Sequence, residues 1–274
     1  MIELPEGTTV ARQIMTELAG RTVTGVFNAT HLHKFTWYSG DPMKYPVLLT
    51  GKTIVGAAGH GAFVDTQLDE GWHLAVSDGV NMRYYASDSD IPAKYQLLLT
   101  LDNNGFLVFT VAMYGGINVF KDCLDNPYYL GAVSKPSPLE NRFDAVYFET
   151  LLSSTKPTAS AKAFLATEQR IPGLGNGVLQ DILFRAKIHP KRKISSLRSE
   201  ELEALFQTVK ELLRQMTDEG GRNTEKDLRG AAGGYQVILS RNTCANPCQV
   251  CGGEIHKEAY LGGAVYYCSG CQPM

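Results

Sequence analysis

Long apolar runs are missing from this 274-residue sequence, and none approaches the roughly 18 residues that a membrane-spanning helix requires. The first residues, Met1-Ile-Glu-Leu-Pro-Glu-Gly7, lack the basic and apolar regions of a secretory signal peptide. Internal repeats and low-complexity segments are also absent. Apolar residues make up 44% and charged residues 20%, which are ordinary values for globular proteins. We therefore expect a soluble cytoplasmic protein with no membrane partner.

An excess of charge of one sign is missing too, because the formal net charge is only −2. Such a balance argues weakly against a nucleic-acid-binding protein. The charges are unevenly distributed, however. Residues 1–150 carry 10 Lys and Arg against 16 Asp and Glu, a net of −6, whereas residues 151–274 carry 16 against 12, a net of +4. A basic half of this kind is typical of a surface that faces phosphates.

Cysteine is scarce, and five of its six residues lie near the C-terminus. Two CxxC pairs, separated by 16 residues, are formed by Cys248, Cys251, Cys268 and Cys271. Without a secretory signal, this spacing indicates metal ligands rather than disulfides, and two such turns can close a tetrahedral site around one structural Zn²⁺. The alternative, reduced core cysteines, is disfavoured because four of the six fall in this pattern. Cys123 and Cys244 are expected to be bystanders.

The N-terminal half is predicted to be a helix followed by antiparallel strands. Residues 5–19 carry apolar residues at helical spacing, with Thr8 or Thr9 as the N-terminal cap. Short β-branched or aromatic segments follow, separated by Gly, Asp and Asn turns. The expected strands are residues 22–27, 53–55, 62–68, 73–76, 82–85, 95–101 and 106–111. Such a series predicts a β-sandwich or a barrel.

The C-terminal half is predicted to be helical up to the cysteines. A Pro- and Ser-containing stretch at residues 134–139 resembles an interdomain linker. The expected helices are residues 142–152, 161–168, 177–186, 199–219 and 225–229. Short strands are expected from residue 233 onward. The fold class is therefore α+β.

A Gly-rich turn lies between two of these helices, at Gly173-Leu-Gly-Asn176. Consecutive backbone N–H groups at a helix N-terminus form an anion-binding site, and Asn176 adds a side-chain donor. Taken alone, such a turn is more often a plain interhelix connection. Cations that could contact a phosphate backbone follow it, namely Lys191, Arg192, Arg222, Lys226 and Arg229. These charges could instead be an ordinary solvated face, but the zinc hairpin downstream favours phosphate contact.

Several short motifs together carry a resemblance to a known family. They are Glu3-Leu-Pro-Glu6, Lys162 with the turn ending at Asn176, and the paired CxxC motifs with Tyr266-Tyr-Cys268. In this order and spacing, the sequence resembles the formamidopyrimidine-DNA glycosylase/endonuclease VIII family along essentially the whole chain. The resemblance implies an antiparallel β-sandwich domain at residues 1–135, a helix–two-turn–helix domain at 136–235 and a four-cysteine zinc finger at 236–274.

Members of that family bind DNA between their domains and flip a damaged base out of the duplex. An N-terminal Pro amine attacks the sugar, an adjacent Glu moves protons, and β,δ-elimination nicks the strand. The resemblance thus implies a monomeric base-excision-repair protein that binds damaged or abasic DNA, with RNA as a further possible partner. In a bacterium it would be associated with the nucleoid.

The family's functional residues are carried over position by position. The resemblance implies catalytic roles for Ile2, Glu3 and Glu6, where Glu3 matches the catalytic Glu. It implies DNA contacts for Lys162 and Asn176, where Asn176 matches the phosphate-binding Asn. The Gly-rich turn and the cations after it add Gly173, Gly175, Lys191 and Arg192 as expected DNA contacts.

Departures from the family pattern concern the chemistry. Ile2 stands where the family has Pro, and a retained Met1 would move the amine one residue away from Glu3. The lysine of the sandwich hairpin corresponds to Gly61 or Ala62. Residues 111–116, Val-Ala-Met-Tyr-Gly-Gly, replace a loop that carries an intercalating Arg, and the zinc-finger Arg corresponds to Gly263.

Two main functions therefore stay open at this level, beside a weaker third one, a protein–protein module in which zinc only stabilises the fold. The first is a divergent glycosylase, with or without strand nicking, in which Glu3 could activate water. The second is a catalytically inactive member that binds DNA or RNA. For Glu3 and Glu6, a structural role at the N-terminus of the first helix is the alternative to catalysis.

Overall fold

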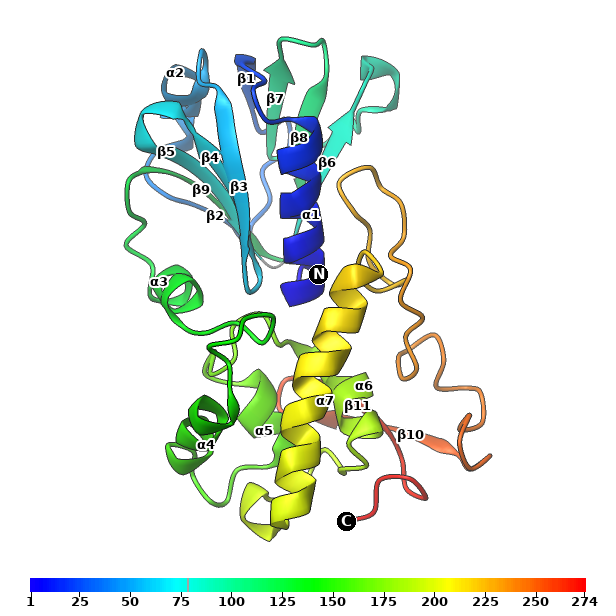
Figure 1. The fold of residues 1–274 in the computed structure, drawn as a ribbon. Helices are drawn as coiled ribbons and strands as arrows, with labels where there is room; N and C mark the ends of the chain where they lie inside the picture. Colours follow the sequence, from blue (N-terminus) through cyan, green and yellow to red (C-terminus); the bar gives the residue numbers. More distant parts are fainter. Residues whose placement is uncertain (78) are drawn as a thin grey trace.

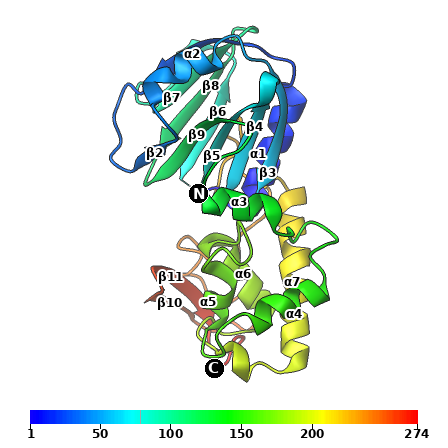
Figure 2. The ribbon, with the colours of Figure 1, turned by 90° about the vertical axis from the view of Figure 1, so that its left-hand side faces the viewer.

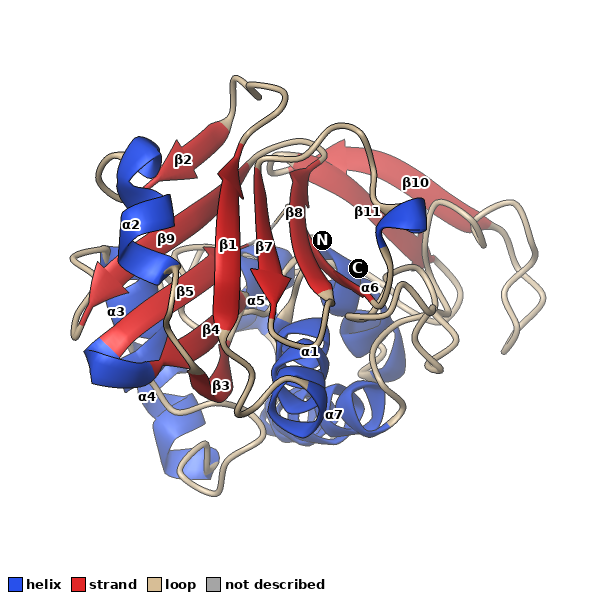
Figure 3. Cartoon of the chain, turned by 90° about the horizontal axis from the view of Figure 1, so that it is seen from above, coloured by secondary structure: helices blue, strands red, loops and turns tan. Residues whose placement is uncertain are grey.

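The computed structural model describes residues 1–77 and 79–274. Figure 1 shows two lobes, with the N-terminal strands above and a group of helices below, and the C-terminal hairpin beside the lower lobe. Helix α1 (Leu4–Glu17) extends from the sandwich toward helix α7 (Ser199–Asp218), and the two helices contact each other where the lobes meet, as seen from above in Figure 3. In the described part of the chain, no helix combines the length and the apolarity needed to cross a membrane.

Two β-sheets form the upper lobe, in the orders β1-β7-β8-β6 and β2-β9-β5-β4-β3. Their strands are β1 Val23–Asn28, β2 Thr36–Tyr38, β3 Ile54–His60, β4 Phe63–Leu68, β5 Trp72–Ser77, β6 Val80–Tyr85, β7 Leu97–Leu101, β8 Phe106–Val111 and β9 Gly115–Lys121. All neighbouring strands are antiparallel except β2 and β9, which are parallel. One apolar core that includes Leu74, Phe109 and Ile117 joins the sheets. The predicted α+β fold with an N-terminal sandwich is confirmed.

Strands β2 and β9 were not expected from the sequence. Six of the seven residues of β9 are buried, so the strand lacks the alternation of apolar and polar residues that marks a half-exposed strand. It also begins with Gly115-Gly116, which is typical of a turn. Strand β2 has only three residues, too few for a recognisable pattern.

Helix α1 begins one residue before the expected start, and its N-cap is Glu3 rather than Thr8 or Thr9. The predicted threonine cap is therefore wrong. Thr8 lies inside the helix, where its Oγ1 donates a hydrogen bond to the Leu4 carbonyl, 2.9 Å away. Val10 and Ile14 are buried against the sheet, as the helical spacing predicted.

Helices of the lower lobe pack around a second apolar core that includes Phe164, Leu179 and Val209. The remaining helices are α2 Tyr45–Leu49 in the upper lobe, α3 Pro127–Ser134, α4 Ala145–Ser153, α5 Ala161–Ala166 and α6 Asn176–Arg185. Single 3-10 turns occur at Pro42–Lys44, Asp69–Gly71, Asp88–Asp90 and Ile194–Ser196. Figure 2 shows α3 between the sheets and the other helices of the lower lobe.

The segment after α7 is a docked loop, so the helix predicted at residues 225–229 is wrong. Gly220 and Gly221, both with positive φ, follow the end of α7. The Leu228 side chain is fully buried in the sandwich core. Its N–H donates to Gln13 Oε1 at 2.9 Å, and its carbonyl accepts from the Tyr84 N–H at 2.8 Å. Because these backbone groups pair with other elements, they are not available for a helix.

The C-terminal hairpin consists of β10 (Ile255–Tyr260) and β11 (Gly263–Cys268). It has a small core of its own with Phe184 and Leu239. Fully buried Gln272 fastens it to the helical lobe, because its Nε2 donates to the Ile188 carbonyl at 3.0 Å and its Oε1 accepts from the Cys268 N–H at 3.1 Å.

Candidate nucleic-acid interface and metal centre

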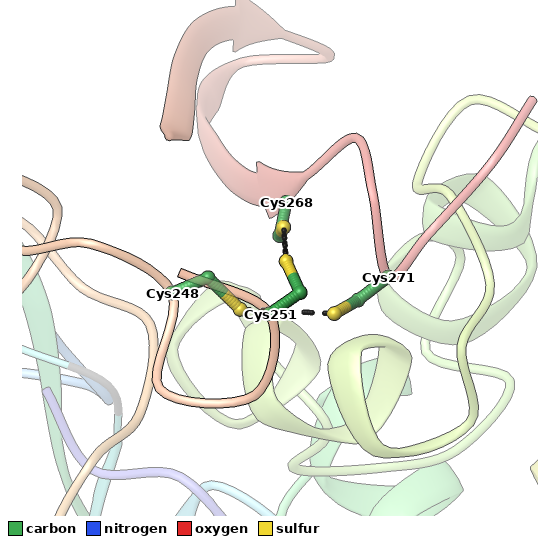
Figure 4. Close-up of side chains that lie close together, drawn as sticks. All are labelled: Cys248, Cys251, Cys268 and Cys271. Carbon is green, nitrogen blue, oxygen red and sulfur yellow. Dashed lines mark hydrogen bonds between the residues drawn. The ribbon is translucent and has the colours of Figure 1, made fainter. Parts of the chain in front are cut away.

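Four cysteine side chains converge beside the hairpin, as Figure 4 shows, and their sulfur atoms all lie within 4.8 Å of one another. The Sγ atoms of Cys251 and Cys268 are 3.3 Å apart, and those of Cys248 and Cys271 are 3.7 Å apart. The Cys248 N–H donates to the Gly253 carbonyl at 2.7 Å, which holds the first turn closed. Four thiolates at this spacing suit a tetrahedral metal ion with metal–sulfur distances of about 2.3 Å. The four cysteines can therefore hold a metal.

The first turns of helix α6 form hydrogen bonds to the hairpin. Asn176 Nδ2 and Gln180 Nε2 both donate to the Ala264 carbonyl, at 2.9 and 3.1 Å, and Gln180 Oε1 accepts from the Tyr266 N–H at 3.0 Å. Asn176 Oδ1 is buried with no hydrogen-bond partner among the described residues. A Cβ atom on Gly263 would lie 3.4 Å from the Asn176 carboxamide. The structure thus brings Asn176 together with Gly263, the position matched to the family's zinc-finger Arg.

The N-terminus of α6 already holds an anion, the carboxylate of Glu3. Glu3 Oε1 accepts from the Gly177 N–H and Glu3 Oε2 from the Val178 N–H, both at 2.8 Å. The Gly173 carbonyl accepts from the Leu4 N–H at 2.9 Å, so the Gly-rich turn is bound to the start of α1. Among the residues that the structure describes, none accepts a hydrogen bond from the N–H of Gly175 or Asn176. The site expected for a phosphate is therefore shared with Glu3.

Arg222 joins Glu3 and Glu6 in a buried ion cluster, with 3–5% of each residue exposed. Its Nη2 and Nε donate to the two carboxylate oxygens of Glu6 at 2.8 and 3.0 Å, and its Nη1 lies 3.5 Å from Glu3 Oε2. Glu6 Oε2 also accepts from the Glu3 N–H at 3.1 Å. The expectation that Arg222 faces a DNA backbone is wrong, because this arginine is enclosed by protein.

The surroundings of the two glutamates drive their pKa values apart. Burial is the largest influence on Glu3 and raises its pKa, although the charge of Arg222 opposes that effect. Burial also disfavours the ionised form of Glu6, but the charge and hydrogen bonds of Arg222 prevail and lower the pKa of Glu6. One carboxyl group therefore holds a proton more readily than the other.

Sequence reasoning missed the role of Arg222 because 216 residues separate it from Glu6. Two glycines permit the cluster. A Cβ atom on Gly175 would lie 2.5 Å from Glu3 Oε1, and one on Gly177 would lie 1.6 Å from Arg222 Nη1. The glycines flanking Asn176 thus give the Glu3 and Arg222 side chains room, a role that the motif alone does not reveal.

The predicted cations near the hairpin are engaged with protein groups. Lys162 is 3% exposed, and its Nζ donates to the Tyr260 carbonyl at 2.6 Å; burial lowers its pKa. Lys191 Nζ pairs with Glu258. Arg192 forms a two-pronged ion pair with Glu201, at 2.6 and 3.0 Å, which lowers the pKa of Glu201 to about 2. DNA contact by these three residues remains a prediction.

Ile2 lies partly buried at the edge of the sandwich core. The Met1 amine pairs with Glu225 of the docked loop. Met1, Ile2 and Glu6, with residues of β6 and of the docked loop, line a cavity of only about 10 Å³. The predicted catalytic residues Ile2, Glu3 and Glu6 are thus close together, in a closed environment.

Comparisons with known proteins find similar proteins of one kind along the whole chain. Residues 135–227 match the family described as the formamidopyrimidine-DNA glycosylase H2TH domain. A protein named formamidopyrimidine-DNA glycosylase from Pelotomaculum thermopropionicum is 30% identical over 279 residues, covering 99% of both chains. One of the same name from Legionella pneumophila is 28% identical and covers 100% of this chain and 99% of its own.

Solved structures share the fold of this chain. Fpg from Lactococcus lactis in complex with DNA containing an abasic site superposes with a TM-score of 0.84 at 24% identity, covering 99% of this chain and 100% of its own. MutM (Fpg) from Thermus thermophilus gives 0.82 at 24% identity, covering 98% of each chain. With its α+β architecture, its four clustered cysteines and a 30% identical relative over nearly its full length, the chain belongs to the formamidopyrimidine-DNA glycosylase family.

Proposed function

We propose that this chain is a monomeric DNA-repair protein that binds damaged or abasic duplex DNA, excises the damaged base and nicks the strand. One observation carries the proposal. The Gly173–Asn176 turn, Glu3 from the N-terminus and the Gly263–Ala264 end of the hairpin meet at one place, although they are distant in sequence. The relatives that match the whole chain are named as glycosylases. In a bacterium, the substrate would place the protein in the cytoplasm at the nucleoid.

The metal in this proposal is one structural Zn²⁺ held by the four cysteines. An all-cysteine set leaves no open coordination position, so the ion stabilises the hairpin and takes no part in catalysis. The separate apolar cores of the sandwich, the helices and the hairpin support the division at residues 135 and 235, although Leu228 of the middle segment packs in the sandwich.

DNA phosphates are proposed to bind at the start of α6. The N–H groups of Gly175 and Asn176 point out of the first turn of a helix, where a partial positive charge favours an anion. Asn176 Nδ2 uses one of its two N–H bonds on the Ala264 carbonyl, and the second adds a donor beside them. Lys191 and Arg192 would contact DNA by exchanging a protein carboxylate for a phosphate, and Lys162 supports the hairpin from within.

Ile2, Glu3 and Glu6 are proposed to carry the chemistry. After removal of Met1, the Ile2 amine would lie beside Glu3 and could attack the sugar as a primary amine. The raised pKa of Glu3 suits it to deliver and accept protons, whereas Glu6 stays ionised and holds Arg222.

A second candidate is a catalytically inactive binder of DNA or RNA. The observation in its favour is the size of the cavity beside Ile2, about 10 Å³, which is too small for a base while the loop is docked. In addition, Ala62 and Gly263 are neutral, whereas the family has a cation at each of these two positions.

Borohydride trapping on abasic-site DNA separates the two candidates. Intact-mass analysis first establishes whether Met1 is removed, and trapping is then measured on the protein whose chain begins at Ile2. A covalent complex, together with strand nicking, is the expected result. Tight binding without trapping or base release would instead select the inactive binder.

We expect Asn176→Ala to weaken the binding of abasic duplexes of every sequence about 10-fold or more, because a hydrogen bond to a charged phosphate contributes about 1.5–3 kcal/mol. The measurement is fluorescence anisotropy, with thermal unfolding as the check on folding. Exposed Asn141, before α4, supplies the matched control, and Asn141→Ala should bind normally. Equal affinities for both variants would remove Asn176 from the interface.

A further inference from the structure

A cavity of about 340 Å³ opens at the end of the five-stranded sheet, apart from the cluster around Glu3. Its lining comes from β2, from the β3–β4 turn, from the start of β9 and from α3. Figure 2 shows α3 beneath this end of the sheet, where the two lobes meet. The volume is within the usual range of about 300–1,000 Å³ for small-molecule pockets.

Small residues create this space. Ala62, Gly115 and Gly116 line the cavity, and they occupy the positions where the family resemblance implies a hairpin lysine and an arginine-bearing loop. A Cβ atom on Gly116 would lie 3.0 Å from Ser77 Oγ and 3.2 Å from Asn118 Nδ2. With small residues at these positions, the recess lacks the side chains of the family's cations.

Aromatic rings form the walls of the recess. Trp37 is 57% exposed, and its ring centroid lies 6.1 Å from that of Tyr114 at an interplanar angle of 57°. Strand β2 holds Trp37 opposite Gly116 of β9, and the Gly115 N–H donates to the Phe35 carbonyl at 3.0 Å. The position of Trp37 is therefore set by the sheet, although its ring is open to solvent.

Amide groups supply the polar edge. Asn118, Asn126 and Gln169 line the cavity, and none of the lining residues within 1–77 and 79–274 carries a charge. Asn126 Oδ1 accepts the N–H groups of Tyr128 and Tyr129 at 2.9 and 3.2 Å, and no described residue accepts from its Nδ2. A neutral, planar heterocycle with donors and acceptors on its edge fits this chemistry, whereas an anion does not.

We propose that the recess binds an unpaired nucleobase of the bound DNA, the base opposite an abasic or excised position, stacked on Trp37 with the tilted Tyr114 ring beside it. The proposal rests on the proposed function, because it requires bound DNA. A base without a pairing partner leaves the duplex at low cost, and stacking on aromatic side chains is independent of sequence. Lys34, three residues before Trp37, is exposed, and its Nζ lies 5.4 Å from the centroid of the Phe35 ring, so it adds a cation near the recess.

The test uses the two tryptophans, Trp37 and Trp72. In a Trp72→Phe protein, Trp37 is the sole indole, and its fluorescence should be quenched by a duplex with a tetrahydrofuran abasic analogue opposite adenine. A fully paired duplex should quench it much less. Trp37→Ala should weaken binding of the abasic duplex about 10-fold and leave binding of the paired duplex unchanged. Tyr128→Ala should act in the same direction.

Phe27→Ala provides the control, because Phe27 is 51% exposed but lies on β1 in the other sheet. This variant should bind both duplexes normally. Equal quenching by the two duplexes, or an unchanged affinity of Trp37→Ala for the abasic duplex, would overturn the base-binding recess and leave the proposed DNA binding intact. If the unaltered protein bound neither duplex, both proposals would be overturned together.

Discussion

Replacing Arg222 with methionine is expected to lower the free energy of unfolding by about 3–5 kcal/mol, the range observed when one partner of a buried ion pair is removed. The substitution keeps much of the side-chain volume but leaves Glu3 and Glu6 without their counter-charge, each at most 5% exposed. Urea unfolding of the intact protein measures the loss. The variant should also loosen the start of α1 from the loop after α7, since Arg222 contacts both glutamates.

The loss of unfolding free energy in Arg222→Met should depend on pH. Without the guanidinium, burial is the dominant influence on both carboxyl groups, so their folded-state pKa values should lie above their unfolded values. A raised folded pKa contributes stability below the unfolded pKa, and that stability is lost as the pH rises through the folded pKa. Arg222→Met should therefore be closer to the unaltered protein at about pH 4 than at about pH 7.

Arg229→Met is the matched control for this prediction. Arg229 pairs with Glu17 at 3.0 Å but is 61% exposed, so solvent screens the interaction. Its removal should change stability far less than removal of Arg222, with little dependence on pH. Similar losses of unfolding free energy for the two variants would mean that the buried cluster contributes no more to stability than an exposed ion pair.

Removing the metal is expected to unfold the zinc finger and to abolish tight DNA binding. Structural zinc binds zinc-finger peptides with roughly 10–16 kcal/mol of apparent free energy, far more than the small core of this hairpin can replace. Chelation or Cys251→Ser should release one zinc ion per chain. Backbone amides of residues 248–271 should then exchange rapidly with solvent. The sandwich and the helices should persist, because they have separate cores.

Cys123→Ser tests whether that effect is specific to the four clustered cysteines. Cys123 is an exposed cysteine in the segment after β9, outside the cluster. Its replacement should leave the zinc content and the DNA affinity unchanged. A protein that contained no zinc when purified, yet held a protected hairpin and bound DNA, would contradict the proposed metal.

Local patterns were sufficient for much of the fold. The spacing of apolar residues predicted α1 and α4 to α7 to within a few residues, because a helix buries one face whatever it packs against. Local patterns failed where contacts with other elements of the fold decide the conformation of a segment. Residues 225–229 have helical spacing, yet Leu228 is drawn into the sandwich and its backbone pairs with Gln13 and Tyr84.

The fold class, the four cysteines of the cluster and the Gly-rich turn that opens α6 could be predicted from the sequence, because each depends on residues close together in the chain. The partners of those residues could not be predicted, because they depend on the packing of distant segments. The tertiary structure placed Glu3 on the amides of Gly177 and Val178, more than 170 residues away, and enclosed Arg222 between two carboxylates. It also opened the recess beside Trp37. Such contacts depend on how separate elements pack in space. Charge pairing and burial between residues so far apart in the chain leave no periodic pattern in the sequence from which they could be predicted.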